Sequence, residues 1–196
     1  MKATSLTIRK IILILYLYEH IHKGGSMPKI IENLQNRLIA EAKRQIAEDG
    51  YSAMTIRSVA AGCSVGVGTV YNYFSSKDEL AASFMLEDWK KCVATIQAVS
   101  TYSETHRPVL LCVYDQLQNF ARDYQTIFRD AAAITNFAGS FTKYHGVLRS
   151  QIAQPLRKFC NDDFTAEFAA EALLTWTMAG KEFEELYTLI ERILKE

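Results

Sequence analysis

Apolar residues along most of the chain recur every three or four positions, which is the spacing of one face of an α-helix. The first clear example comprises Ile31, Leu34, Leu38, Ala42 and Ile46. Gly50 follows this set, where a helix commonly ends on a residue with left-handed backbone. No stretch shows the two-residue alternation of a half-buried β-strand. The pattern therefore predicts an all-α protein.

Two short helices with a tight break between them are predicted next. The first begins after Thr55, a good N-cap, and the second runs to Phe74, with the break around residues 63–65. Ser76 with Glu79 three residues later has the spacing of a capping box, in which each residue caps the other's backbone amide. This pair predicts the start of a third, longer helix.

The remainder of the chain reads as a series of longer helices. We expect them over residues 77–100, 108–134, 142–159, 164–178 and 181–194. Pro108 is tolerated in a first turn because no amide hydrogen is needed there. Pro155 should kink or end its helix, Gly139 and Ser140 mark a loop, and Gly180 is a hinge between the last two helices.

Residues 55–74 have the layout of a helix-turn-helix, in which the second helix is presented to the major groove of DNA. Val70 and Phe74 are expected to point inward, and residues 67, 68, 69, 72 and 73 outward. Gly66 and Gly68 stand at the start of this second helix, although a helical Gly costs about 1 kcal/mol. Glycines there make sense if the backbone must approach something bulky.

This region resembles the tetracycline-repressor (TetR) family of bacterial regulators. The matching residues are Thr55, Val59-Ala60, Gly68-Thr69-Val70-Tyr71-Asn72-Tyr73-Phe74 and Ser76-Lys77-Asp78-Glu79-Leu80. The resemblance covers about residues 30–90 and does not extend to the C-terminal half. It implies a helix-turn-helix DNA-binding domain over residues 27–76, and a helical effector-binding and dimerisation domain over residues 77–196.

The resemblance also implies the DNA contacts. Thr55, Tyr73 and Lys77 would bind phosphates, other side chains of the second helix would lie along the groove, and Gly68 would allow close backbone approach. The candidate DNA-binding residues are Thr55, Val67, Gly68, Thr69, Tyr71, Asn72, Tyr73 and Lys77. Two positions depart from the family pattern, because Ser64 replaces the usual turn Gly and Gly66 replaces the usual Ser/Thr cap.

The C-terminal half is rich in aromatic residues, with 16 of the 22 in the chain lying between residues 84 and 196. A ring-lined helical cavity would suit a small apolar or aromatic effector. The candidate pocket residues are Phe120, Tyr124, Phe128, Phe141, Tyr144, His145 and Trp176. Aromatic residues at helical spacing are also typical of an ordinary core, and the sequence leaves this alternative open.

The last two predicted helices carry apolar faces that suit a four-helix interface between two copies of the chain. The candidate dimer residues are Phe164, Phe168, Ala172, Phe183, Leu186, Tyr187, Ile190 and Leu194. The family resemblance implies the same homodimer. Two recognition helices about 34–36 Å apart would read a palindromic operator.

Charge and the N-terminal segment limit other interpretations. The formal net charge is zero, so any contact with DNA must come from a local arrangement of donors.

The apolar run at residues 11–18 is shorter than the about 20 residues that span a bilayer, and no membrane association is expected. Lys23-Gly24-Gly25 precedes Met27 and could be encoded by a ribosome-binding site. We therefore expect residues 1–26 to be an upstream extension outside the fold.

The four cysteines, Cys63, Cys92, Cys112 and Cys160, are too widely spaced for a disulfide framework or a zinc site, and no cofactor is expected. The sequence thus predicts a cytoplasmic repressor, released from double-stranded operator DNA by a small molecule. The alternatives are a helix-turn-helix regulator switched by a partner protein or by cysteine oxidation, an activator, and, more remotely, a small helical enzyme.

Overall fold

The structure is a computed structural model that describes residues 33–129 and 141–194, apart from the side chains of 128–129 and 141–144. Every regular element in these ranges is helical, which confirms the all-α prediction. The predicted upstream extension, Ile31 and the loop at Gly139 and Ser140 lie outside the described residues.

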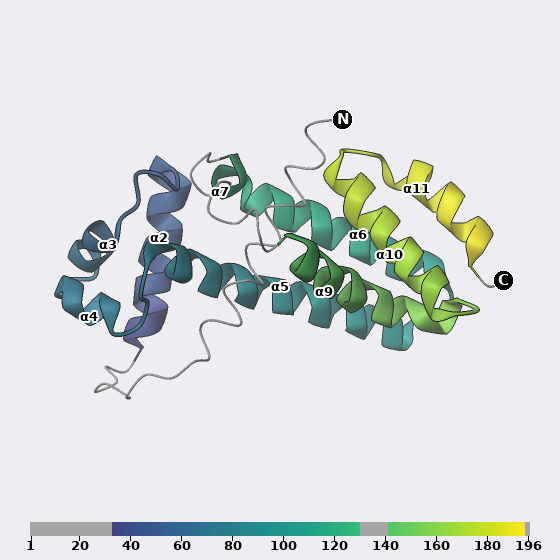
Figure 1. Ribbon diagram of the computed structural model, residues 1–196, viewed down its shortest axis with the longest axis horizontal. Coiled ribbons are helices and arrows are strands. Elements are labelled where there is room, and N and C mark those ends of the chain that lie inside the picture. Colours follow the sequence, from purple (N-terminus) through teal and green to yellow (C-terminus); the bar gives the residue numbers. More distant parts are fainter. Residues whose placement is uncertain (1–32, 130–140, 195–196) are drawn as a thin grey trace.

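Three helices form the N-terminal unit, at the left of Figure 1: α2 (Leu34–Asp49), α3 (Ile56–Gly62) and α4 (Val67–Tyr71). The buried face of α2 includes Leu34, Leu38, Ala42 and Ile46, as its sequence pattern predicts. Gly50 ends this helix with φ 86°, and its amide donates to the Ile46 carbonyl at 3.1 Å. The predicted C-cap is therefore confirmed.

Helix α5 (Lys77–Tyr102) leaves the N-terminal unit and runs along the remaining helices (Figure 1). Its N-cap is Ser76, whose hydroxyl accepts a hydrogen bond from the Glu79 amide at 3.0 Å. The Glu79 carboxylate accepts from the Ser75 amide at 2.6 Å, one residue before the cap. The start of the helix was predicted correctly, but the return bond of the capping box reaches Ser75 instead of Ser76.

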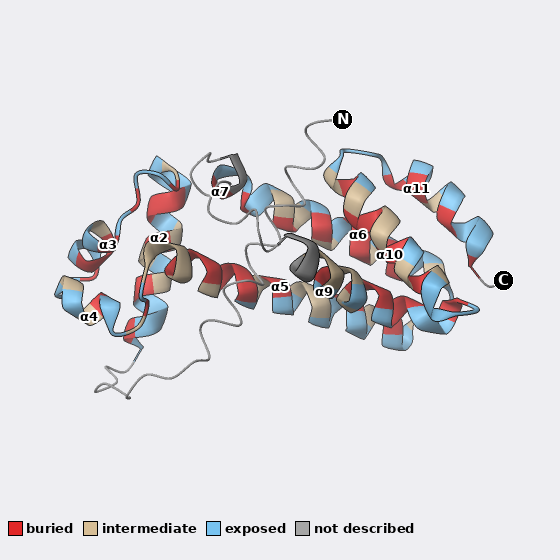
Figure 2. Cartoon of the chain, viewed as in Figure 1, coloured by how far each residue is buried: buried red, intermediate tan, exposed pale blue. Residues whose placement is uncertain are grey.

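The C-terminal part packs around α5. It comprises α6 (His106–Asp123), α7 (Gln125–Arg129), α9 (Phe141–Ala153), the 3-10 helix η2 (Gln154–Phe159), α10 (Asp163–Met178), α11 (Phe183–Ile190) and the 3-10 helix η3 (Glu191–Ile193). Helix α6 lies between α5 and α10, and α9 packs on α10. Figure 2 shows the buried faces of these helices turned toward one another.

Two breaks refine the sequence-based boundaries. The helix predicted over residues 108–134 is interrupted at Tyr124, which separates α6 from α7. The helix predicted over residues 142–159 changes to 3-10 geometry at Gln154. Pro155 explains the second break, because it lacks an amide hydrogen and its ring crowds the preceding turn.

Asp88 of α5 joins the N-terminal unit to the C-terminal helices. Its Oδ2 accepts from Lys43 Nζ of α2 at 2.6 Å and from the Tyr124 hydroxyl at 2.5 Å. Its Oδ1 accepts from Lys91 Nζ at 2.9 Å. Partial burial acts to raise the pKa of Asp88, but hydrogen bonds from Lys43, Tyr124 and Lys91 outweigh it and lower the pKa to about 2. The ionised carboxylate therefore stabilises the contact between α2 and α5.

We predict that Asp88→Asn lowers the free energy of unfolding at neutral pH by about 1.5–3 kcal/mol, the range for hydrogen bonds to charged groups. Because the pKa of Asp88 is lower in the folded chain, this contribution is complete above about pH 5 and is lost progressively as the pH falls through about 4 and then through the folded pKa of about 2. Urea unfolding of both proteins at several pH values measures it. The control is Asp115→Asn, which alters an exposed carboxylate on α6. Equal stability of wild type and Asp88→Asn would contradict the prediction.

Candidate nucleic-acid interface

Helix α3 begins with a complete capping box. The Thr55 hydroxyl oxygen accepts from the Ser58 amide at 3.0 Å, and Ser58 Oγ accepts from the Thr55 amide at 3.0 Å. Ile56, Val59 and Ala60 are buried against the N-terminal unit, as predicted. The cap fixes the point at which the chain turns into α3, and it keeps Thr55 at the surface.

Polar contacts fix α3 on α2. Ser58 Oγ donates to Gln45 Oε1 at 2.6 Å, and Arg37 Nη2 donates to the Cys63 carbonyl at 2.8 Å. Gly62 leaves room for the Glu41 side chain of α2, since a Cβ at this position would lie 2.2 Å from Glu41 Oε1. Helix α3 therefore has a defined position from which the turn and α4 project.

The turn between α3 and α4 contains Ser64 in left-handed backbone, with φ 56°. This is the position where the family pattern has Gly. A residue with a Cβ costs about 1–2 kcal/mol in this conformation, so the fold tolerates some strain here. The Val65 amide donates to the Ala60 carbonyl at 2.9 Å and closes the turn.

Helix α4 is shorter than predicted, because it ends at Tyr71 and residues 72–73 form a turn. Val70 and Phe74 are buried, as predicted. Gly68 and Asn72 are exposed, the Tyr71 side chain is 53% exposed, and Thr69 is half-buried. Val67 and Tyr73 differ from the expectation of outward positions, since both are half-buried and pack against the core.

Several of the candidate residues border one open pocket of about 530 Å³. Its lining includes Thr55 and Arg57 from the start of α3, Val67 and Tyr71 from α4, and Ser76 and Lys77 from the start of α5. The starts of α3 and α5 both border this pocket, although the caps already bind the Ser58 and Glu79 amides of their first turns. Hydroxyl groups, cations and helix N-termini are the groups that bind phosphate oxygens.

Arg57 is a residue that the sequence interpretation missed. It is exposed and lines the pocket, beside the predicted contacts Thr55 and Tyr71. Its position was open to inference, because Arg57 follows the inward-facing Ile56 and precedes the next inward residue, Val59. A cation in the outward part of that first turn is favourably placed for a phosphate.

Lys77 is at the predicted place but has protein partners. Its Nζ donates to the Tyr51 carbonyl at 2.8 Å and lies 4.3 Å from the centroid of the Tyr51 ring. A further carbonyl, that of Ser52, lies 3.5 Å away. Lys77 therefore ties the end of α2 to the start of α5, and this reduces the donors available for a phosphate.

The four candidate effector residues whose side chains are described, Phe120, Tyr124, His145 and Trp176, do not gather around one cavity. Phe120 and Tyr124 are buried, with ring centroids 4.8 Å apart, and Phe120 packs edge-on to Trp89. His145 Nε2 lies 2.7 Å from Glu171 Oε2, and the Trp176 side chain is exposed. The side chains of Phe128, Phe141 and Tyr144 lie outside the described residues. Among the described residues, the aromatic stripe of α6 is core, which is the alternative that the sequence left open.

The candidate dimer residues fall into two groups. Phe164 and Phe168 on α10 are exposed, whereas Ala172 and Tyr187 are half-buried. Phe183, Leu186, Ile190 and Leu194 are buried within the chain itself, in contrast to the prediction. The reason is that this face of α11 and η3 packs on the chain's own helices, as in the Tyr114–Phe183 ring contact. The exposed apolar residues of α11 and η3 are instead Leu189 and Ile193.

No helix in the described part of the chain is both long enough and apolar enough to cross a membrane.

Comparison with known sequences gives a match in the N-terminal unit. A family model described as "Bacterial regulatory proteins, tetR family" matches residues 38–84. The HTH-type transcriptional regulator HbdR of Aromatoleum sp. (strain CIB) is 34% identical over 53 residues, which cover 27% of this chain and 23% of HbdR. The HTH-type transcriptional repressor DhaR of Mycobacterium sp. (strain GP1) is 25% identical over 120 residues, which cover 61% of this chain and 58% of DhaR. The chain thus matches about a quarter of the length of HbdR and more than half of DhaR.

Solved structures extend the likeness in fold to most of the chain. A TetR-family transcriptional regulator from Pectobacterium atrosepticum has a TM-score of 0.65 at 18% identity, covering 84% of this chain and 96% of its own. A transcriptional regulator from Streptomyces coelicolor A3(2) has a TM-score of 0.62 at 16% identity, covering 84% of this chain and 99% of its own. At sequence identities of 16% and 18%, the likeness to these two structures is a likeness of fold alone.

Proposed function

Because this chain belongs to the TetR family of transcriptional regulators, we propose that it is a repressor that binds a palindromic operator as a homodimer and is released by a small molecule. The observation that carries the proposal is the pocket bordered by Thr55, Arg57, Tyr71 and Lys77, next to the exposed backbone of Gly68. Residues 27–76 would form the DNA-binding domain and residues 77–196 the effector and dimer domain, in the bacterial cytoplasm.

The interface suits a duplex by shape as well as by charge. Among the described residues, no atom beyond the adjoining backbone of α4 lies within 4 Å of where a Gly68 Cβ would be, so the backbone of α4 is open to close approach. Tyr71 and Asn72 are exposed at the other end of the helix and offer a hydroxyl and an amide. With α4 in the major groove, the sugar-phosphate backbone of the DNA would pass the start of α3 and contact Thr55 and Arg57. The half-buried Val67 is suited to touching a thymine methyl.

The proposed dimer uses a face of α10. Phe164, Phe168 and Trp176 lie four and eight residues apart on one side of this helix, with the half-buried Ala172 between them. Exposed rings on one helix face are apolar surface of the kind that marks protein interfaces, and α11 and η3 add the exposed Leu189 and Ile193. In a symmetric dimer α10 and α11 of both copies would make a four-helix contact.

A small molecule is favoured over cysteine oxidation as the releasing signal. Burial raises the pKa of the Cys63 and Cys112 thiols, and it raises the pKa of Cys92 to about 11. Little reactive thiolate is therefore present at these three cysteines at neutral pH. A regulator is also favoured over a small helical enzyme, because the matched relatives are named as transcriptional regulators.

Arg57→Ala tests the interface. We expect it to weaken binding to duplex DNA from around the protein's own gene by about tenfold, uniformly across sequences. The slope of log affinity against log salt should also fall by about one, because one phosphate contact is lost. Fluorescence anisotropy at several salt concentrations measures both quantities. Arg122→Ala, an exposed arginine on α6, is the control and should match wild type. An unchanged slope for Arg57→Ala would remove this residue from the site.

A further inference from the structure

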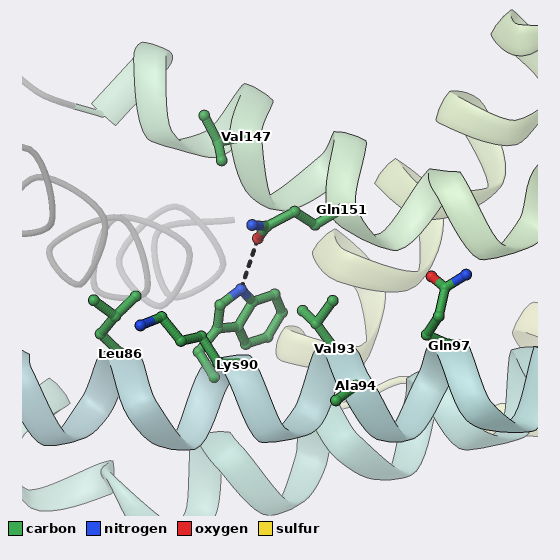
Figure 3. A pocket seen from close by; sticks show the side chains of 8 residues that line it. Leu86, Lys90, Val93, Ala94, Gln97, Val147 and Gln151 are labelled. Atoms are coloured by element: carbon green, nitrogen blue, oxygen red, sulfur yellow. Dashed lines mark hydrogen bonds between the residues drawn. The ribbon is translucent and has the colours of Figure 1, made fainter.

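A half-open cavity of about 370 Å³ lies between α5 and α9 (Figure 3), within the range of small-molecule sites. Leu86, Val93 and Ala94 of α5 and Val147 of α9 line it, and Trp89 forms part of its wall. The cavity is in the C-terminal part of the chain, away from the end that carries α3 and α4 (Figure 1). None of its lining residues was among the candidate effector residues.

The polar groups of the cavity have a fixed orientation. Trp89 is buried, and its ring packs edge-on to Phe120 at 5.6 Å. Its Nε1–H donates to Gln151 Oε1 at 2.8 Å. An indole nitrogen can only donate, so the amide oxygen of Gln151 must face Trp89 and the NH₂ group must face elsewhere. Figure 3 shows that NH₂ group on the side of the cavity where Leu86 and Lys90 lie.

Lys90 supplies a positive charge at the same end. Its Nζ lies 3.4 Å from Glu87 Oε1, in a pair whose two side chains are both more than half exposed. Such exposed pairs are weak, so a ligand carboxylate can compete with Glu87 for the ammonium group. The ammonium of Lys90 and the NH₂ of Gln151 are both donors. This end of the cavity is therefore suited to an anionic acceptor, and it discriminates against a cationic head group.

We propose that this cavity binds a small amphipathic carboxylic acid, with its carboxylate between Lys90 and Gln151 and its apolar body against Val93, Ala94 and Val147. Gln97 borders the opposite end. The seven residue steps from Lys90 to Gln97 span about 10 Å of helix, which is the length of a fused two-ring acid. The inference deepens the proposed function, because it names the chemical class of the effector.

The position of the cavity also gives such a ligand a route to the DNA-binding unit. Lys90 is two residues from Asp88, which contacts Lys43 of α2. Ligand binding between α5 and α9 therefore acts on the helix that holds α2 in place. A ligand that prefers a different α5 position would shift the pair of recognition helices away from the spacing that fits DNA.

Isothermal titration calorimetry on the full chain without DNA tests the site, with 2-naphthoate and its neutral analogue 2-naphthamide as probes. We expect 2-naphthoate to bind at least about tenfold more tightly than 2-naphthamide, because only the acid forms charge-assisted hydrogen bonds. Lys90→Gln should remove this preference. The matched control is Lys181→Gln, since Lys181 is also about half exposed and lies 3.4 Å from Glu185. It should retain the wild-type preference.

A second variant tests the location of the site independently of charge. Ala94 is exposed, so Ala94→Trp fills the cavity without entering the core; it should abolish binding of both probes while the thermal unfolding curve stays cooperative. Equal affinity of wild type for the two probes, a preference that survives in Lys90→Gln, or no binding of either probe would overturn the inference. These outcomes are independent of DNA, so operator binding by the same ligand-free protein tests the proposed function separately.

Discussion

Gly68→Glu is expected to abolish operator binding, with a loss of affinity of at least about 100-fold, while the protein stays folded. Gly68 is exposed on α4, and in the described part of the chain no atom beyond the adjoining helix backbone lies within 4 Å of the position that a Cβ would take. The substitution therefore meets nothing within the protein. In the groove the same side chain would occupy space meant for the duplex and place a carboxylate near phosphates. A like-charge juxtaposition costs several kcal/mol at an interface, and each 1.4 kcal/mol is a factor of about ten in affinity.

Stability provides the second readout for Gly68→Glu. Glu is a better helix former than Gly, so the free energy of unfolding should stay equal or rise by up to about 1 kcal/mol. Gly146→Glu is the matched control, since Gly146 lies in α9 and also has no atom within 4 Å of its Cβ position. It adds the same charge far from α4, and it should bind operator as the wild type does. Wild-type affinity in Gly68→Glu would show that α4 does not approach DNA closely.

The double substitution Phe164→Glu and Phe168→Glu is expected to convert the protein to a monomer. The Phe164 and Phe168 side chains are 77% and 54% exposed in the single chain, so their replacement leaves its core intact. In the proposed dimer, two copies would place four carboxylates at one apolar contact, where each charge loses water without gaining a partner. Sedimentation velocity measures the change in mass, and circular dichroism checks that the helices remain.

Loss of the dimer should also lower operator affinity by more than about 100-fold, because each monomer can bind only one half-site. Tyr102→Glu is the control, since Tyr102 is 87% exposed at the end of α5 and lies outside the proposed interface. It should remain dimeric. If the double variant sedimented as a dimer, the α10 face would not be the interface.

Most of the helices were predictable because the determinants are local. Apolar spacing identified the buried face of α2, caps at Thr55 and Ser76 fixed the starts of α3 and α5, and Pro155 marked the change to 3-10 geometry. The break at Tyr124 was not predictable in this way. Tyr124 bonds to Asp88, 36 residues earlier, and such a tertiary contact leaves no periodic signal in the sequence.

The sites show the same division between local and tertiary information. The motif positions between Thr55 and Lys77 were enough to name residues that border one pocket, whereas Arg57 lies within this stretch but was overlooked because it is not one of the positions that match the family pattern. Periodicity grouped Phe183, Leu186 and Ile190 on one face of α11. It could not indicate whether that face meets a partner or the chain's own core. The cavity beside Lys90 could not be predicted from the sequence, because α5 and α9, which line it, come together only in the folded chain.

Hydroxyl-radical footprinting of the DNA around the protein's own gene tests whether α4 from each of two subunits inserts into a major groove. We expect two protected half-sites related by a dyad, with centres about 34–36 Å apart or a multiple of one helical turn. Protection should vanish with Gly68→Glu and persist with Gly146→Glu. A single protected site without a dyad, or equal protection by Gly68→Glu and wild type, would contradict it.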